Sequence, residues 1–299
     1  MQHGIRPRTG LGTVVCAGLW LAATGAAAQV SLSDGLWSTS FIGCPTGDLG
    51  AGDVCDGLRA VSPEYVCGSS PARHSQIASE ANYPGGAGGN GFALYYEGNA
   101  RNIFSTGLLL EMSPPQPELW LRFYRMWPVG QTWGGILEHK IIYLFTDAGV
   151  ALNINYPQGE DDIGVQPRNT MGSPDLYYPG NGWRTLNGGE LVGDGAWHAF
   201  EIHVRLGTAG ANDGLFEMWI DGEPVVSITG MDFFDGGARS PTGFSEVELP
   251  SNHNVSTLAG CAESRVDDIA LAVPGYAGFT LDPQGRSMIG LLGARPAPA

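Results

Sequence analysis

The chain has 299 residues, with 15 basic and 30 acidic side chains, 46 glycines and 20 prolines. This length allows one large β domain, and the glycine and proline content favours many short strands joined by tight turns over long helices. The net charge of −15 argues against nucleic acid as a partner, and it also argues against a polyanion unless basic side chains gather locally.

The first 28 residues read as a cleavable export signal. Arg6 and Arg8 precede an apolar run over residues 11–23, and the small residues 26–28 follow it. That run is too short for a permanent membrane span, so we expect a secreted or periplasmic protein with no membrane span. Removing the signal leaves 13 basic and 30 acidic side chains, a net charge of −17. We expect a monomer with one domain over 29–292 and a disordered tail over 293–299.

Four cysteines remain after the signal, and an oxidising compartment predicts two disulfides among them. Three pairings are possible and the sequence does not choose among them, although three of the four lie close together near the N-terminus. The cysteines concerned are Cys44, Cys55, Cys67 and Cys261.

Strand signals then follow in chain order. Residues 31–90 predict loops and edge strands, residues 91–98 and 107–112 predict two strands, and the prolines at 114, 115 and 117 predict a break. Residues 118–127 alternate clearly: Leu119, Leu121 and Phe123 fall on one face, and Trp120, Arg122 and Tyr124 on the other, which we interpret as a binding face.

Residues 136–145 and 150–156 predict two further strands joined by a turn at 147–149, and residues 157–195 predict a long loop region. Residues 197–228 predict a hairpin of two alternating strands, after which Asp221-Gly222 turns the chain toward Val225-Val226. Residues 232–254 predict loops, and 264–273 a closing strand.

Three stretches together resemble the concanavalin A-like lectin and glucanase superfamily, which includes laminin G-like modules and polysaccharide lyases. They are ELWLRFYRMW with HKIIYLF, the hairpin WHAFEIHVRL with FEMWIDGEPV, and the closing RVDDIAL. The resemblance implies an all-β jelly-roll sandwich of two antiparallel sheets with a concave, sugar-binding face. The paired-carboxylate strand of the glucanases and the RxExR, QxH and YxKxGxYxQ strands of alginate lyases are missing here.

β-Elimination on a uronate glycan needs a group to neutralise the carboxylate, a base for the C5 proton and an acid for the leaving oxygen, and it needs no metal cofactor. The candidates for these roles are Arg122, Tyr124, His139, Lys140, Tyr143 and His253. Strict alternation predicts that His139 and Tyr143 share one face of their strand and Lys140 the other. The structural alternatives are that Lys140 is exposed and pairs with Glu138, and that His139 and Tyr143 form a pair in the core.

Sugar binding favours aromatic platforms and planar polar groups. The candidates are Trp120, Trp133, Tyr177, Trp183, His203 and Arg205. Asp267 matches the position that holds a structural calcium in many relatives, with Asp48 or Asp53 as further ligands. We therefore expect an exported polysaccharide-binding protein, and our leading hypothesis is that it is a polysaccharide lyase. A non-catalytic lectin or laminin G-like module is the alternative.

Overall fold

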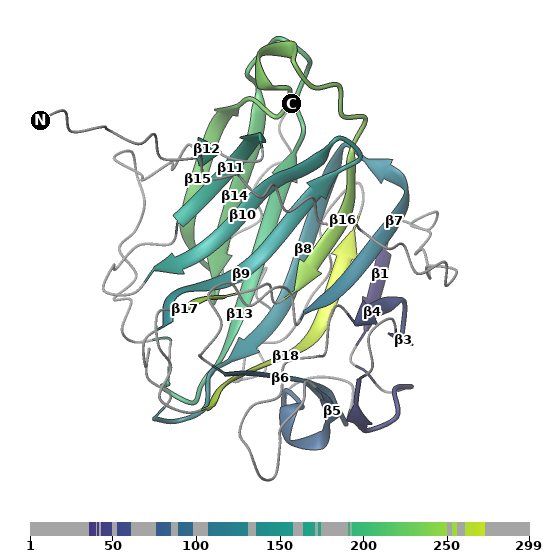
Figure 1. Ribbon diagram of the computed structural model, residues 1–299, viewed down its shortest axis with the longest axis vertical. Helices are drawn as coiled ribbons and strands as arrows, with labels where there is room; N and C mark the ends of the chain where they lie inside the picture. The colour runs from purple at the N-terminus through teal and green to yellow at the C-terminus, as the bar shows by residue number, and fades with distance from the viewer. Residues whose placement is uncertain are drawn as a thin grey trace, which may run out of the picture.

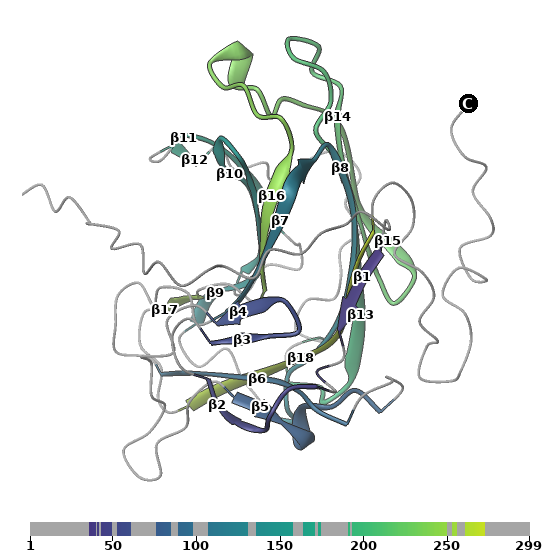
Figure 2. The same cartoon turned by 90° about the vertical axis from the view of Figure 1, so that its right-hand side faces the viewer.

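Two antiparallel sheets make up the fold, and they pack face to face as two layers (Figure 1, Figure 2). The computed structural model describes residues 36–39, 41, 43–49, 53–60, 76–84, 89–97, 107–130, 136–157, 164–170, 173–174, 191, 193–249, 253–255 and 261–272. Only the backbone is described at 36–38, 95–97, 136–140, 150, 155–157, 164, 166–170, 173–174, 235, 253–255 and 261–262.

The first sheet, which we call the β8 sheet, contains the strands of the predicted hairpin and the closing strand. In spatial order its strands are β15 (Glu223–Met231), β14 (Gly214–Ile220), β13 (Trp197–Arg205), β8 (Glu118–Met126), β18 (Cys261–Ala272), β6 (Gly91–Glu97), β5 (Gln76–Ala78) and β2 (Gly47–Asp48), and β1 (Leu36–Thr39) also pairs with β18.

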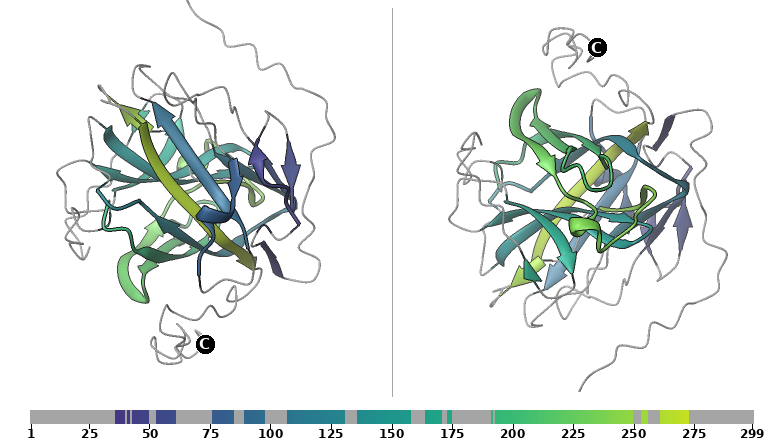
Figure 3. Two further views of the ribbon diagram at one scale, coloured as in Figure 1. Left: turned by 90° about the horizontal axis from the view of Figure 1, so that it is seen from below. Right: turned by 90° about the horizontal axis from the view of Figure 1, so that it is seen from above.

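The second sheet, the β9 sheet, lies across the core from the first. Its strands are β12 (Ser173–Pro174), β11 (Gly164–Thr170), β10 (Gly149–Pro157), β9 (Ile136–Thr146), β16 (Phe244–Leu249), β7 (Leu108–Gln116), β4 (Leu58–Ala60) and β3 (Val54–Cys55), and β17 (His253–Val255) also pairs with β9. Two short 3-10 helices, η1 (Ser79–Ala81) and η3 (Asp235–Gly237), complete the described elements. The N-terminal strands and the β14–β15 hairpin lie at opposite sides of the sandwich (Figure 3).

The core lies between the sheets and confirms the alternation of β8 and the hairpin. Leu119, Leu121 and Phe123 of β8 are at most 2% exposed and pack into one cluster with the inward residues of the β9 sheet. Burying each such side chain stabilises the fold by about 1.5–3 kcal/mol. The inward residues of the neighbouring strands in this cluster include Phe200, Ile202, Val204, Phe216, Met218, Ile142, Leu144, Leu152, Ile154, Val247 and Leu249.

The predicted chain break is confirmed at Pro117, which separates β7 from β8, but it is wrong at Pro114 and Pro115, because β7 continues through them. The register with β16 shifts there: Glu111 pairs with Glu246 and Gln116 with Phe244, so the residues between them bulge out of the ladder. A proline is tolerated at a bulge because no ladder hydrogen bond needs its missing N–H.

Two stretches predicted as loops contain strands. The region 157–195 includes β11 and β12, and the region 232–254 includes β16 and β17. In β16, Phe244, Val247 and Leu249 pack in the core while Glu246 and Glu248 do not. The sequence FSEVEL carries this alternation on its last four residues. The glycines, prolines and asparagines on either side masked that short signal.

Candidate functional site

A row of polar side chains crosses the outer face of the β9 sheet. Asn153 of β10 pairs with Tyr143 of β9, and Tyr143 pairs with Glu248 of β16. Directly paired residues in antiparallel strands place their side chains on the same face, with Cβ atoms about 5 Å apart. None of the three belongs to the core cluster, and they are 0%, 7% and 6% exposed, respectively. An amide, a phenol and a carboxylate are therefore adjacent in an environment largely closed to water.

The next row of the same face is acidic. Glu246 of β16 pairs with Glu111 of β7 on one side and with Phe145 of β9 on the other. Glu111 accepts a hydrogen bond from the guanidinium of Arg59 on β4 at 2.7 Å. Burial raises the pKa of Glu246, the charge of Glu111 raises it further, and Arg59 partly offsets both. We refer to Tyr143, Asn153 and Glu248 as the Tyr143 row, and to Phe145, Glu246 and Glu111 as the Glu246 row.

The strand that carries Tyr143 also carries two other predicted catalytic residues, His139 and Lys140. The expectation from strict alternation is wrong here: Ile142 pairs with Ile154, yet Lys140 pairs with Asn155, so the register shifts at Ile141. Ile141 and Ile142 are both core residues, as this irregularity requires. The position of Lys140 therefore falls on the same face as Tyr143.

His253, the predicted loop histidine, lies in β17 and pairs with His139. The fold thus brings His139, Lys140, Tyr143 and His253 onto adjoining strands of one sheet. For His139, Lys140 and His253 the backbone alone is described. Their roles as acid, base or ligand stay predictions.

Arg122 and Tyr124 lie elsewhere, so the predicted grouping of these two with Lys140 and Tyr143 is wrong. They belong to β8, which lies in the other sheet (Figure 2). They alternate with core residues, so they face away from the β9 sheet. The two segments are consecutive in sequence, but the chain crosses from one layer to the other between them. Consecutive strands in a sandwich need not be neighbours in one sheet.

The predicted sugar ligands Trp120, His203 and Arg205 lie on this same outer face of the β8 sheet. Trp120 stacks on His203 with ring centroids 3.8 Å apart. The His203 Nε2 and Nδ1 atoms lie 2.7 Å and 3.1 Å from carboxylate oxygens of Glu118 and Glu217. Arg205 is exposed and donates to the carbonyl of Asp213. These contacts fix His203 firmly within the sheet face.

Arg122 and Tyr124 are also enclosed by neighbours. Tyr124 is fully buried and stacks on Tyr83 with centroids 3.8 Å apart. Arg122 is 7% exposed, and its charge acts on Asp268, whose pKa burial raises and Arg122 lowers in part. This is the environment of packed structural side chains.

Asp267, the predicted calcium ligand, is fully buried in β18. Its two carboxylate oxygens accept the backbone N–H groups of Tyr83 and Asp268, each at 2.7 Å. Burial raises its pKa to about 7, although both N–H groups act in the opposite direction. The groups described at its oxygens are hydrogen-bond donors rather than oxygen ligands, so they do not fit a calcium shell. Calcium at this position stays an untested prediction.

Cys44 and Cys55 form a disulfide with Cα atoms 5.6 Å apart, which confirms a local N-terminal bridge. Together with Asp56 they make up the single cluster of three metal-ligand side chains among the described residues, and their bonded sulfurs rule out a thiolate site. Cys67 lies outside the described residues, as do Trp133, Tyr177 and Trp183, and the side chain of Cys261 is not described.

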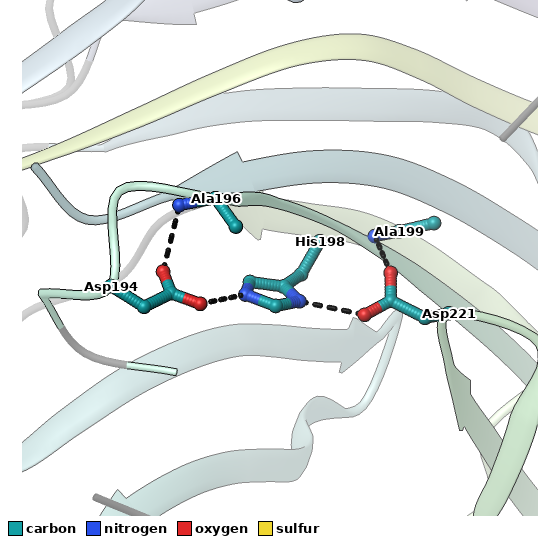
Figure 4. Close-up of polar contacts among 5 residues, drawn as sticks. All are labelled: Asp194, Ala196, His198, Ala199 and Asp221. Atoms are coloured by element: carbon teal, nitrogen blue, oxygen red, sulfur yellow. Dashed lines mark hydrogen bonds and ion pairs between the residues drawn. The ribbon is translucent and has the colours of Figure 1, made fainter. Parts of the chain in front are cut away.

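A histidine between two aspartates lies where β13 begins (Figure 4). The His198 Nδ1 atom is 2.6 Å from Asp221 and its Nε2 atom is 2.9 Å from Asp194. Each aspartate also accepts a backbone N–H, from Ala199 and Ala196 respectively. Burial lowers the pKa of His198, but the hydrogen bonds and charges of Asp221 and Asp194 outweigh it, so the net shift is upward. The cluster fastens the loop before β13 to the β14–β15 turn.

Comparison with known proteins identifies the fold. No protein-family model and no curated protein matches the sequence. Among solved structures, the alginate lyase Aly36B aligns with a TM-score of 0.52 at 14% identity, over 82% of this chain and 99% of that one. The chain has the concanavalin A-like jelly-roll fold.

Two further solved structures also align with the chain. A variant of Aly36B in complex with an alginate tetrasaccharide aligns with a TM-score of 0.52 at 13% identity, over 82% of this chain and 99% of that one. The endo-beta-1,4-glucuronan lyase from the fungus Trichoderma reesei aligns with a TM-score of 0.47 at 12% identity, over 70% and 90%. The described part of the chain contains no helix long and apolar enough to cross a membrane.

Within the concanavalin A-like fold, sequence reasoning missed Asn153, Glu248 and the Glu246 row. A signal for Asn153 exists in VALNINY, where asparagines alternate with core residues. Glu248 was hidden because its strand was read as a loop. Neither residue type indicates chemistry by itself, and only the pairing of β10, β9 and β16 places the two beside Tyr143.

Proposed function

We propose that the protein is an exported polysaccharide lyase that binds a uronate-containing glycan on the outer face of the β9 sheet. The observation that carries this proposal is the Tyr143 row, in which an amide, a phenol and a carboxylate occupy directly paired positions on three adjacent strands. The register position of Lys140, the one lysine of the chain, lies on the same face.

Each role in β-elimination has a candidate in this set. The Asn153 amide is suited to donate a hydrogen bond to the uronate carboxylate, which makes the C5 proton more acidic. Lys140 takes that proton, the C4–O bond breaks as the C4–C5 double bond forms, and the Tyr143 phenol protonates the leaving oxygen. Glu248, opposite Tyr143, is suited to orient the phenol.

Structural neighbours support the substrate class. Two solved complexes of Aly36B, with an alginate tetrasaccharide and a trisaccharide, contain double variants in which a lysine is replaced by alanine together with a tyrosine or a methionine. The Cys44–Cys55 disulfide is consistent with a protein that works outside the reducing cytoplasm.

The test is to incubate the protein with a panel of uronate polysaccharides and to follow the ultraviolet absorbance of unsaturated uronate ends. We expect absorbance to rise on at least one glycan, and Lys140→Ala to abolish the rise without lowering the melting temperature. Binding to a glycan with no absorbance change on any of them would identify a lectin instead and overturn the lyase proposal.

A further inference from the structure

We propose that Glu246 and Glu111 make this face select glycans in which uronates alternate with neutral sugars, in preference to homopolyuronates. The inference rests on the proposed function, because it assigns the substrate class of the same site. It concerns the Glu246 row, which the proposed chemistry does not use.

The geometry places two carboxylates next to the proposed reacting groups. Glu246 is two residues from Glu248 on β16 and directly opposite Glu111 on β7, so all three glutamates share one sheet face. Neighbouring positions on that face are about 5–7 Å apart. This is close to the spacing of successive sugars along a glycan, so a chain bound at the Tyr143 row places its next sugar near Glu246.

The basic side chain in this part of the face is already engaged. Arg59 pairs with Glu111 at 2.7 Å and is about one-third exposed on its side chain. Glu246 faces Phe145 on its other side, so no cation is paired with it in register. Arg59 is paired with Glu111 and only partly offsets the charge on Glu246, so a second uronate carboxylate at this point would meet net negative charge.

The repulsion between a uronate carboxylate and Glu246 is enough to discriminate between a homopolyuronate and an alternating glycan. Two unit charges about 7 Å apart near a protein surface repel strongly enough to change a dissociation constant several-fold, even after screening by salt. Like charges on one face also weaken the sheet itself. Burial is the main cause of the raised pKa of Glu246, and the charge of Glu111 adds to it.

A neutral sugar suits the same positions. Carboxylates accept hydrogen bonds from sugar hydroxyls, and Phe145, a partly exposed ring paired with Glu246, offers an apolar surface for the C–H face of a pyranose. A carboxylate beside an aromatic ring is the combination expected for an uncharged, hydroxyl-rich sugar.

The experiment measures dissociation constants by calorimetry at mildly alkaline pH. The probes are an alginate tetrasaccharide, a tetrasaccharide alternating glucuronate with N-acetylglucosamine, and cellotetraose. Three proteins are compared: the native chain, Glu246→Gln, and Glu80→Gln, which removes the same charge from an exposed position in η1.

We expect the native protein to bind the alternating tetrasaccharide more tightly than the alginate one. Glu246→Gln should strengthen alginate binding by about three- to ten-fold, and Glu80→Gln should leave it unchanged. Equal or tighter native binding of alginate, unaffected by Glu246→Gln, overturns this inference and leaves the proposed function standing. Binding of cellotetraose alone, with neither uronate probe bound, contradicts the proposed function itself.

Discussion

The outer faces of the two sheets carry similar residue types but differ in how those residues are engaged. On the β8 sheet, His203 lies between two carboxylates and against Trp120, and Asp267 accepts two backbone N–H groups. On the β9 sheet, Tyr143 has an amide on one side and a carboxylate on the other, each supplied by a different strand.

This difference shows that residue type alone does not mark a site. A histidine, an arginine and tryptophans in alternation with core residues are equally compatible with a sugar-binding face and with a packed polar layer. The partners decide, and on the β8 sheet they are structural: stacked rings, paired carboxylates and backbone amides. The predictions below test whether the two faces differ as strongly in function.

The largest expected effect is on catalysis, and two matched tyrosine substitutions test it. Tyr143→Phe should lower kcat by about 10²–10⁴-fold, because it removes the proposed proton donor. Tyr124→Phe makes the same change at a buried tyrosine of the other sheet, and it should leave kcat within about two-fold, since its hydroxyl is remote from the proposed site. Steady-state absorbance assays measure both. A larger loss for Tyr124→Phe would move the site to the β8 sheet.

The next effect is on stability. Arg122→Ala should lower the free energy of unfolding by about 3 kcal/mol. The substitution removes the buried guanidinium and leaves the Asp268 carboxyl without the positive charge that acts on it. In a domain of this size that corresponds to a fall in melting temperature of about 6–12 °C. Calorimetry measures it. If Arg122→Ala instead melts like the native protein but binds glycan weakly, Arg122 is a ligand and the comparison fails.

Asp267→Ala should cost about 2 kcal/mol, because it leaves the buried N–H groups of Tyr83 and Asp268 without their acceptor. Melting should be followed with added calcium and with a chelator. We expect the same loss in both, since the described partners of Asp267 are N–H donors. A native melting temperature that drops on chelation, with no drop in Asp267→Ala, would establish the predicted calcium site.

The smallest effect is pH-dependent and concerns His198. Because its pKa is raised in the folded state, the imidazolium stabilises the fold fully below its ordinary pKa of about 6.5, and this contribution is lost as the pH rises through the raised value. His198→Gln should therefore cost about 1 kcal/mol at acidic pH and less in alkaline solution. Urea titrations across that range measure it. A cost that grows as the pH rises would show that the neutral ring is the stabilising form.

Much of the fold followed from short-range pattern. The alternation in residues 118–127 and in the 197–228 hairpin predicted which side chains pack in the core, and Leu119, Phe123, Phe200 and Ile202 lie there. The pattern failed where a strand was short, as in β16, and where the register shifted, as at Ile141. Periodicity is a local property, and a bulge changes the face of every residue beyond it.

The sequence by itself determined that the chain is all-β, since it consists of alternating strands punctuated by glycine and proline. The resemblance of three stretches to the concanavalin A-like superfamily implied the jelly roll. Only the tertiary structure decided which strands share a sheet. It placed Arg122 and Tyr124 in one layer and Lys140 and Tyr143 in the other, and it brought Asn153 and Glu248 beside Tyr143. The physical reason is that a side chain's face is set within its own strand, whereas its neighbours are set by pairing between strands far apart in the chain.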